Sequence, residues 1–186
     1  MIKGNNLKLK RDLVILAISL ALSVALWKTD LIDSFLAQSE NHLLNAFLAG
    51  FFFSSAFTTM PAVALLTKIS QFASPSTIAI LGATGALISD SIIFYFIKDK
   101  LLKDFKNTLN KPRLTRITHF FKSKIIRFSV AITGGILIAL PLPTDETAFA
   151  LMGISKIKMP TFIVVAFTFN FIAIYLMASG ARYFAV

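Results

Sequence analysis

The chain has no cysteine, two histidines and a single tryptophan among its 186 residues. The missing cysteine excludes disulfides, thiolate metal sites and a cysteine nucleophile. The histidines, His42 and His119, lie far apart in the sequence, which excludes a metal site built from several imidazoles. A glycine-rich phosphate loop and a Ser–His–Asp set are also missing. We therefore expect no cofactor.

Acidic residues are scarce as well: nine stand against 19 lysines and arginines, for a formal net charge of +10. Ten of the basic residues lie in the connector formed by residues 98–127. Nucleic-acid-binding proteins carry similar charge, but here the charge flanks apolar runs and one tryptophan gives bases little to stack on. We expect no nucleic-acid partner. The expected partner is membrane lipid, with anionic headgroups at this connector.

Hydrophobic residues make up 56% of the chain and gather into five apolar stretches. These are residues 13–27, 43–66, 76–97, 128–153 and 161–179. A helix of about 17–25 apolar residues crosses the hydrocarbon core of a bilayer. The composition therefore predicts an all-α polytopic membrane protein, with residues 1–186 forming a single integral membrane domain.

The distribution of charge indicates how this chain crosses the membrane. Basic residues beside short loops stay on the cytoplasmic side, and both residues 1–12 and the connector are basic. Three apolar stretches lie between these two basic segments. If all three crossed the bilayer, the connector would lie outside, whereas two crossings keep it cytoplasmic. We therefore predict that residues 43–66 enter and leave on one side as a re-entrant hairpin, with Thr58, Thr59 and Pro61 at its tip. The predicted location is the cell (plasma) membrane, with the N-terminus cytoplasmic. Residues 1–27 could also be a cleaved signal peptide of the same orientation.

A second re-entrant hairpin is predicted at residues 128–153, which are broken in the middle by polar residues and prolines. The residues at this break are Pro141, Pro143, Thr144, Asp145 and Glu146. Residues 161–179 then cross outward, so that the C-terminus is extracytoplasmic. After Pro112, apolar residues recur at helical spacing among basic ones, which predicts an amphipathic helix on the cytoplasmic surface. The fold would thus have three spanning helices and two opposed hairpins.

The two halves of the chain resemble each other. Residues 62–66 (Ala-Val-Ala-Leu-Leu) match residues 148–152 (Ala-Phe-Ala-Leu-Met), and residues 75–78 match residues 160–163. The offsets are 86 and 85 residues, so one spacing nearly holds. Repeat 1 covers about residues 43–97 and repeat 2 about 128–179. Their opposite orientation makes them an inverted repeat, which is typical of transporters.

Asp145, Glu146 and Asp90 are the candidate transport or proton-site residues. Carboxylates at membrane depth are costly and usually face an interior or a watery cavity; a cytoplasmic surface loop is the alternative for the first two. Asp90 could pair with a basic residue, and Asn170 could bond a neighbouring helix. Gly82 and Gly85 share a helix face and predict close packing. An intramembrane aspartyl hydrolase would use carboxylates on two different helices, and Asp90 is the one membrane-embedded acid besides Asp145 and Glu146. That alternative stays open, but we expect no enzyme.

These motifs resemble the DedA family, also called SNARE-associated or VTT-domain membrane proteins. Residues 142–146 (Leu-Pro-Thr-Asp-Glu) followed by residues 150–153 look like that family's second hairpin motif. Gly82 and Gly85, running on to Asp90 and Tyr95, look like its glycine-rich helix. The likeness covers roughly residues 43–179. Two features depart from the family's pattern: the second hairpin lacks arginine and the first lacks a carboxylate.

The resemblance implies a lipid-handling role, either flipping or scrambling of phospholipid or recycling of a polyprenyl-phosphate carrier. Proton coupling through an acid–arginine pair is in doubt, because the arginines are missing. Two alternatives stay open. One is an exporter of small or cationic solutes that uses Asp145 and Glu146 as counter-charge. The other is a structural or assembly protein without a substrate. The sequence leaves the oligomeric state open, a homo-oligomer included.

Overall fold

The structure is a computed structural model. It describes residues 14, 17–25, 28, 29, 32, 34, 36, 41–55, 57–108, 123–140, 145–155 and 157–184. All regular structure within these residues is helical. The predicted all-α class is confirmed. The amphipathic helix expected after Pro112 lies mostly outside the described residues, as does part of the first apolar stretch.

The first predicted hairpin is two helices: α3, His42–Phe53, and α4, Thr59–Ile69. The helix break falls slightly earlier than expected, at residues 54–58, because Thr59 and Pro61 already belong to the first turn of α4. Proline fits there because the first N–H groups of a helix have no intrahelical partner. At the open end of the hairpin, the His42 ring stacks on Phe72, with centroids 4.6 Å apart.

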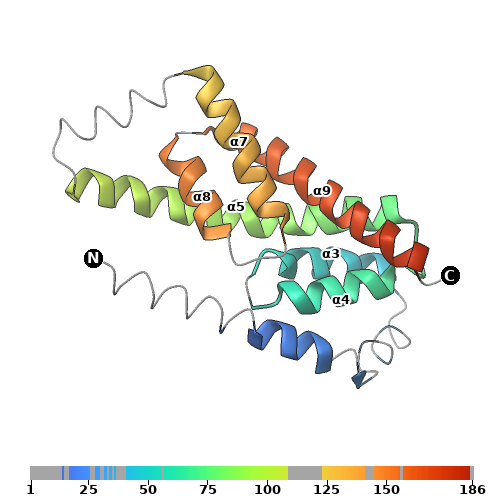
Figure 1. The fold of residues 1–186 in the computed structure, drawn as a ribbon. Coiled ribbons are helices and arrows are strands. Elements are labelled where there is room, and N and C mark those ends of the chain that lie inside the picture. The colour runs from blue at the N-terminus through green and yellow to red at the C-terminus, as the bar shows by residue number, and fades with distance from the viewer. Residues whose placement is uncertain are drawn as a thin grey trace.

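Helix α5, Pro75–Thr108, is the long axis of the molecule (Figure 1). The Ser74 hydroxyl caps its first turn by accepting from the Thr77 N–H at 3.2 Å. Its segment Pro75–Lys98 is one of two in the described residues that are long and apolar enough to cross a membrane. The other, Met159–Tyr183, lies in α9, Met159–Phe184. Less than half of either segment is buried.

Residues 128–153 are also broken, as predicted, into α7, Lys124–Ala139, and α8, Asp145–Ile154. This second hairpin packs on the far half of α5 and along α9 (Figure 1). Its open end lies near Lys98, whose Nζ donates to the Ile157 carbonyl oxygen at 3.0 Å. The two hairpins therefore lie beside opposite halves of α5.

Two apolar clusters hold these helices together. The first contains Ala49, Leu66, Ile78 and Ile174, from α3, α4, α5 and α9. The second is built on three fully buried rings, Phe94, Phe149 and Phe162, from α5, α8 and α9. The rings of Phe94 and Phe162 stack with centroids 4.1 Å apart. The region between the clusters, along α5 and α9, holds the polar groups described next.

Candidate functional site

Asp90 of α5 and Asn170 of α9 meet in the interior of the molecule. The Asn170 Nδ2 donates to Asp90 Oδ2 at 2.7 Å, and both residues are fully buried. Asn170 lies near the midpoint of the segment Met159–Tyr183, and Asp90 lies about one helical turn past the midpoint of Pro75–Lys98. Asp90 therefore bonds the side-chain amide of Asn170, and not a basic residue, which was one of the partners considered from the sequence.

The polar pair is only partly satisfied. Asp90 Oδ1 and Asn170 Oδ1 are buried and have no hydrogen-bond partner among the described residues. Asn170 Oδ1 can only accept, and Asp90 Oδ1 also accepts unless the carboxyl group carries a proton. Buried polar atoms are nearly always hydrogen-bonded, so two orphaned oxygens on one pair are unusual. They leave room for a proton or a donor group from outside the described residues.

Packing explains why these two side chains meet. α5 and α9 are antiparallel: Phe94 faces Phe162, and Gly82 faces Ile174 nearer the other end. Asp90 and Asn170 fall between those two contacts, where the first apolar cluster ends and the second begins. The pair therefore lies at the junction of the two hydrophobic clusters.

The turn between α3 and α4, at the closed end of the first hairpin, reaches this junction. Ser54, directly after α3, is buried and donates from Oγ to the Ala86 carbonyl oxygen at 3.2 Å, one turn before Asp90. The Ser54 side chain also lies beside the Asp90 carboxyl group. The sequence marks Ser54 only as a polar interruption of an apolar stretch, because its contact with α5 depends on packing over a long distance in the chain.

Thr58 and Thr59 stabilise the turn between α3 and α4. Thr58 Oγ1 donates to the Phe52 carbonyl oxygen at 2.7 Å, and Thr59 Oγ1 donates to the Phe53 carbonyl oxygen at 3.0 Å. The last carbonyls of α3 have no partner within their own helix. The two hydroxyls therefore donate to carbonyl oxygens at the end of α3. They do not replace the backbone N–H that Pro61 lacks, because Pro61 lies in α4.

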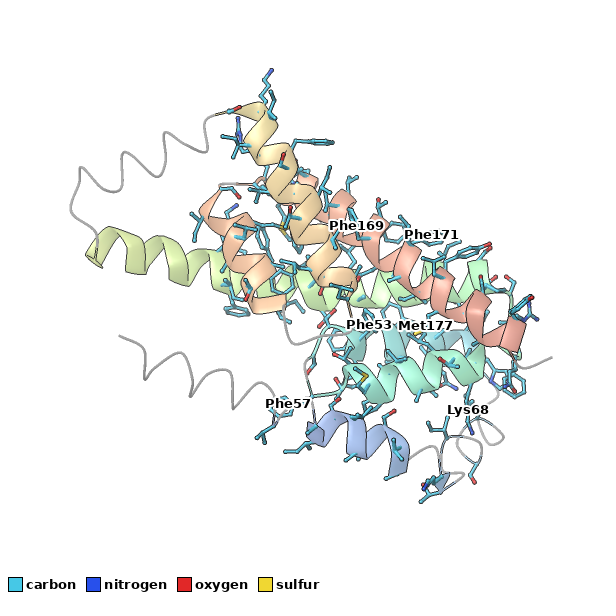
Figure 2. All side chains as sticks on the ribbon, viewed as in Figure 1. Phe53, Phe57, Lys68, Phe169, Phe171 and Met177 are labelled. Atoms are coloured by element: carbon cyan, nitrogen blue, oxygen red, sulfur yellow. The ribbon has the colours of Figure 1, made fainter. Side chains whose placement is uncertain are left out.

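Glycines allow the first hairpin to lie against α5. A Cβ on Gly85 would overlap the Phe47 carbonyl oxygen, and a Cβ on Gly50 would overlap the Gly82 carbonyl oxygen. Gly82 and Gly85 thus sit at the closest approach of α3 and α5. In the second hairpin, Gly135 is packed against Phe169, which Figure 2 labels on α9.

The residues at the second hairpin tip are only partly visible. Asp145 and Glu146 begin α8, but their side chains lie outside the described part of the structure, as do Pro141, Pro143 and Thr144. Within the described residues, no group of three or more histidine, aspartate or glutamate side chains could hold a metal ion.

Comparison with known proteins gives no match: no protein-family model, no curated protein and no solved structure is similar to this chain.

Proposed function

We propose that this protein is a membrane transport protein of the DedA/VTT type that translocates lipid, as a flippase or scramblase. The observation that carries the proposal is the buried Asp90–Asn170 pair, which lies within about one helical turn of the middle of both helices that can cross a membrane. A carboxyl group at such depth costs about 2.5–3.5 kcal/mol or more in lipid and usually serves a pathway. The sequence resemblance to the family points the same way.

The outer faces of α5 and α9 support a membrane location. Large apolar side chains stand exposed along both helices; they include Ile80, Ile88, Ile92, Val164, Ile172 and Leu176. Patches of this kind on a protein surface mark contact with lipid or with another protein. Because these side chains lie on two segments of 24 and 25 residues that are long enough to cross a bilayer, we infer that they contact lipid.

The dimensions of the first hairpin support a re-entrant arrangement. α3 has 12 residues and α4 has 11, so each arm is about 16–18 Å long, well short of the roughly 30 Å hydrocarbon core. The arms meet again at the stacked rings of His42 and Phe72. A hairpin of this length would enter from one face of the bilayer and end near its middle, at the depth of Ser54.

Helix boundaries support an inverted repeat. Adding 85 to the bounds of α4, Thr59–Ile69, gives 144–154, against Asp145–Ile154 for α8. Adding 85 to Pro75, where α5 begins, gives 160, against Met159 for α9. Because α5 and α9 are antiparallel, the two halves point in opposite directions, as in transporters whose sites lie where broken helices meet.

Equivalent residues in the two halves play equivalent roles at this offset. Gly50 and Gly135 each let a hairpin arm pack on the long helix that follows it. Ser70 and Ser155 are both fully buried after the second arm. The Ser70 hydroxyl donates to the Thr67 carbonyl oxygen, and the Ser155 hydroxyl donates to the equivalent Met152 carbonyl oxygen at 3.1 Å as well as to that of Leu151. Such matched local contacts favour a common origin of the halves over chance similarity of apolar sequences.

The test is lipid scrambling by the purified protein in vesicles that carry a fluorescent phospholipid, with external dithionite as the quencher. We expect the wild-type chain to expose inner-leaflet lipid and Asp90→Asn to slow this at least tenfold. The matched control, Thr168→Val, changes an exposed hydroxyl of α9 that bonds only its own helix, and should scramble at the wild-type rate. Wild-type vesicles that behave like protein-free vesicles would contradict lipid translocation.

A further inference from the structure

A groove lies between the first turns of α7 and α9, away from the Asp90–Asn170 pair. It has a volume of about 650 Å³, which is in the range of ligand sites. Three basic residues line it: Lys124, Arg127 and Lys158. Its remaining walls are largely apolar and include Phe128, Ala131, Ile132, Val164 and Val165. None of the lining residues is acidic.

Two helix ends add positive charge to the same groove. α7 begins at Lys124 and α9 at Met159, and residues from the first turn of each line the groove. The helices run in the same direction, since their first turns meet at the groove and Gly135, further along α7, packs on Val165 and Phe169, further along α9. The free N–H groups of both first turns therefore lie at one end of the molecule, where each helix carries about half a positive charge.

The apolar part of the groove continues onto an exposed helix surface. Phe128 and Val164 are each 65% exposed, and Ile132 stands one turn beyond Phe128 on α7. A ligand that satisfies the groove must hence have a negatively charged end and a long apolar part that can lie along α7 and α9. A free anion would leave the apolar walls uncovered, and a neutral apolar molecule would leave three cations without counter-charge from the residues that line the groove.

We propose that this groove binds one anionic glycerophospholipid, with its phosphate among Lys124, Arg127 and Lys158 and an acyl chain along Phe128, Ile132 and Val164. The groove is at the end of the molecule that bears the basic connector, so the lipid would come from the leaflet on that side. Binding here does not require that the protein move lipid, and the site is distinct from the pair on which the proposed function rests.

The experiment places a tryptophan in the groove and measures its quenching by brominated lipids. The single native tryptophan is first removed by Trp27→Phe. Val164→Trp then reports on the groove, and Leu176→Trp, at 64% exposure on the same helix, reports on ordinary lipid contact. Each protein is reconstituted with brominated phosphatidylglycerol or brominated phosphatidylcholine of identical acyl chains.

We expect phosphatidylglycerol to associate about tenfold more strongly than phosphatidylcholine at Val164→Trp, and about equally at Leu176→Trp, because each cation near a membrane surface contributes up to about fivefold. Lys124→Gln, Arg127→Gln and Lys158→Gln together should bring the ratio at Val164→Trp close to one. Arg182→Gln, which removes a cation from the other end of α9, should leave it unchanged. If the triple variant does not fold, Lys158→Gln alone should lower the ratio severalfold.

Equal ratios at the two tryptophans, or a ratio that survives loss of the three cations, would overturn the proposal. Inorganic phosphate at millimolar concentration should not relieve quenching by phosphatidylglycerol; if it does, the groove is a free-anion site. Scrambling measured on the same samples separates the two hypotheses. A phosphatidylglycerol preference without scrambling would refute the proposed function and leave this site standing, and the reverse result would do the opposite.

Discussion

At the level of single side chains, substitutions at Asp90 and Asn170 can tell a role in transport from a purely structural role. Asp90→Asn keeps the shape of the pair and adds an N–H donor that can serve the orphaned Asn170 Oδ1. We expect this variant to be at least as stable as the wild type in detergent, measured by its thermal midpoint, although it loses scrambling. A residue kept for stability alone would show the opposite pattern, with a lower midpoint and unchanged transport.

Asn170→Leu makes the complementary change. It removes the donor to Asp90 Oδ2 and leaves this buried carboxyl group without its amide partner. Stranding one buried polar partner costs about 1–3 kcal/mol, or more when the group is charged. We expect a lower thermal midpoint than for Thr168→Val, whose hydroxyl bonds only its own helix. Equal midpoints for the two variants would mean that the Asp90–Asn170 bond adds no stability.

Sequence reasoning reaches some of these residues and misses others for a physical reason. Local signals mark the broken stretches, since prolines and clustered threonines interrupt a helix wherever it packs. The bond between Asp90 and Asn170 joins residues 80 apart, and no spacing rule links an acid on one helix to an amide on another. The role of Gly50 was missed likewise, as was the meeting of Lys158 with the connector residues Lys124 and Arg127 in the α7–α9 groove, because both depend on which helices become neighbours.

For the helices, the predicted role of the glycines can be tested against an internal control. Gly85→Ala would press a methyl group on the Phe47 carbonyl oxygen, and backbone cannot give way as a flexible side chain can. Overpacking of this kind typically costs about 1–3 kcal/mol. Gly180→Ala, with nothing within 4 Å of the added carbon, should be neutral or slightly stabilising. Thermal unfolding of both variants in the same detergent makes the comparison.

The turn between α3 and α4 depends on hydroxyls that end one helix while the next begins. Thr59→Val keeps the side-chain shape and removes the hydroxyl that donates to the Phe53 and Ser55 carbonyl oxygens. We expect a loss of about 0.5–1.5 kcal/mol in the free energy of unfolding and slower scrambling, since Ser54 and Asp90 lie beside this turn. Thr84→Val is the control, because the Thr84 hydroxyl bonds within its own helix, to the Ile80 carbonyl oxygen. A Thr59→Val variant indistinguishable from Thr84→Val would show that the turn is held by other contacts.

For the complete chain, the decisive question is on which side of the membrane each hairpin opens. The chain has no cysteine, so single cysteines can be introduced without altering any native one. Gln71, at the open end of the first hairpin, and Lys158, at the open end of the second, are both exposed and lie beside opposite ends of the Pro75–Lys98 segment. If α5 crosses the bilayer once, these two positions must lie on opposite sides.

Charge predicts which side is which. Lys158 shares its end of the molecule with Lys98, Lys124 and Arg127, so this end should be cytoplasmic. In intact cells, a membrane-impermeant maleimide should label Gln71→Cys, and Tyr183→Cys at the far end of α9, but should label Lys158→Cys only after permeabilisation. With a cytoplasmic N-terminus, protection of both Gln71→Cys and Lys158→Cys would mean that both broken stretches cross the bilayer. Protection of Gln71→Cys with labelling of Lys158→Cys would mean that the first stretch crosses and the second does not. Either result would refute the proposal of two opposed re-entrant hairpins, because the basic connector would then lie outside.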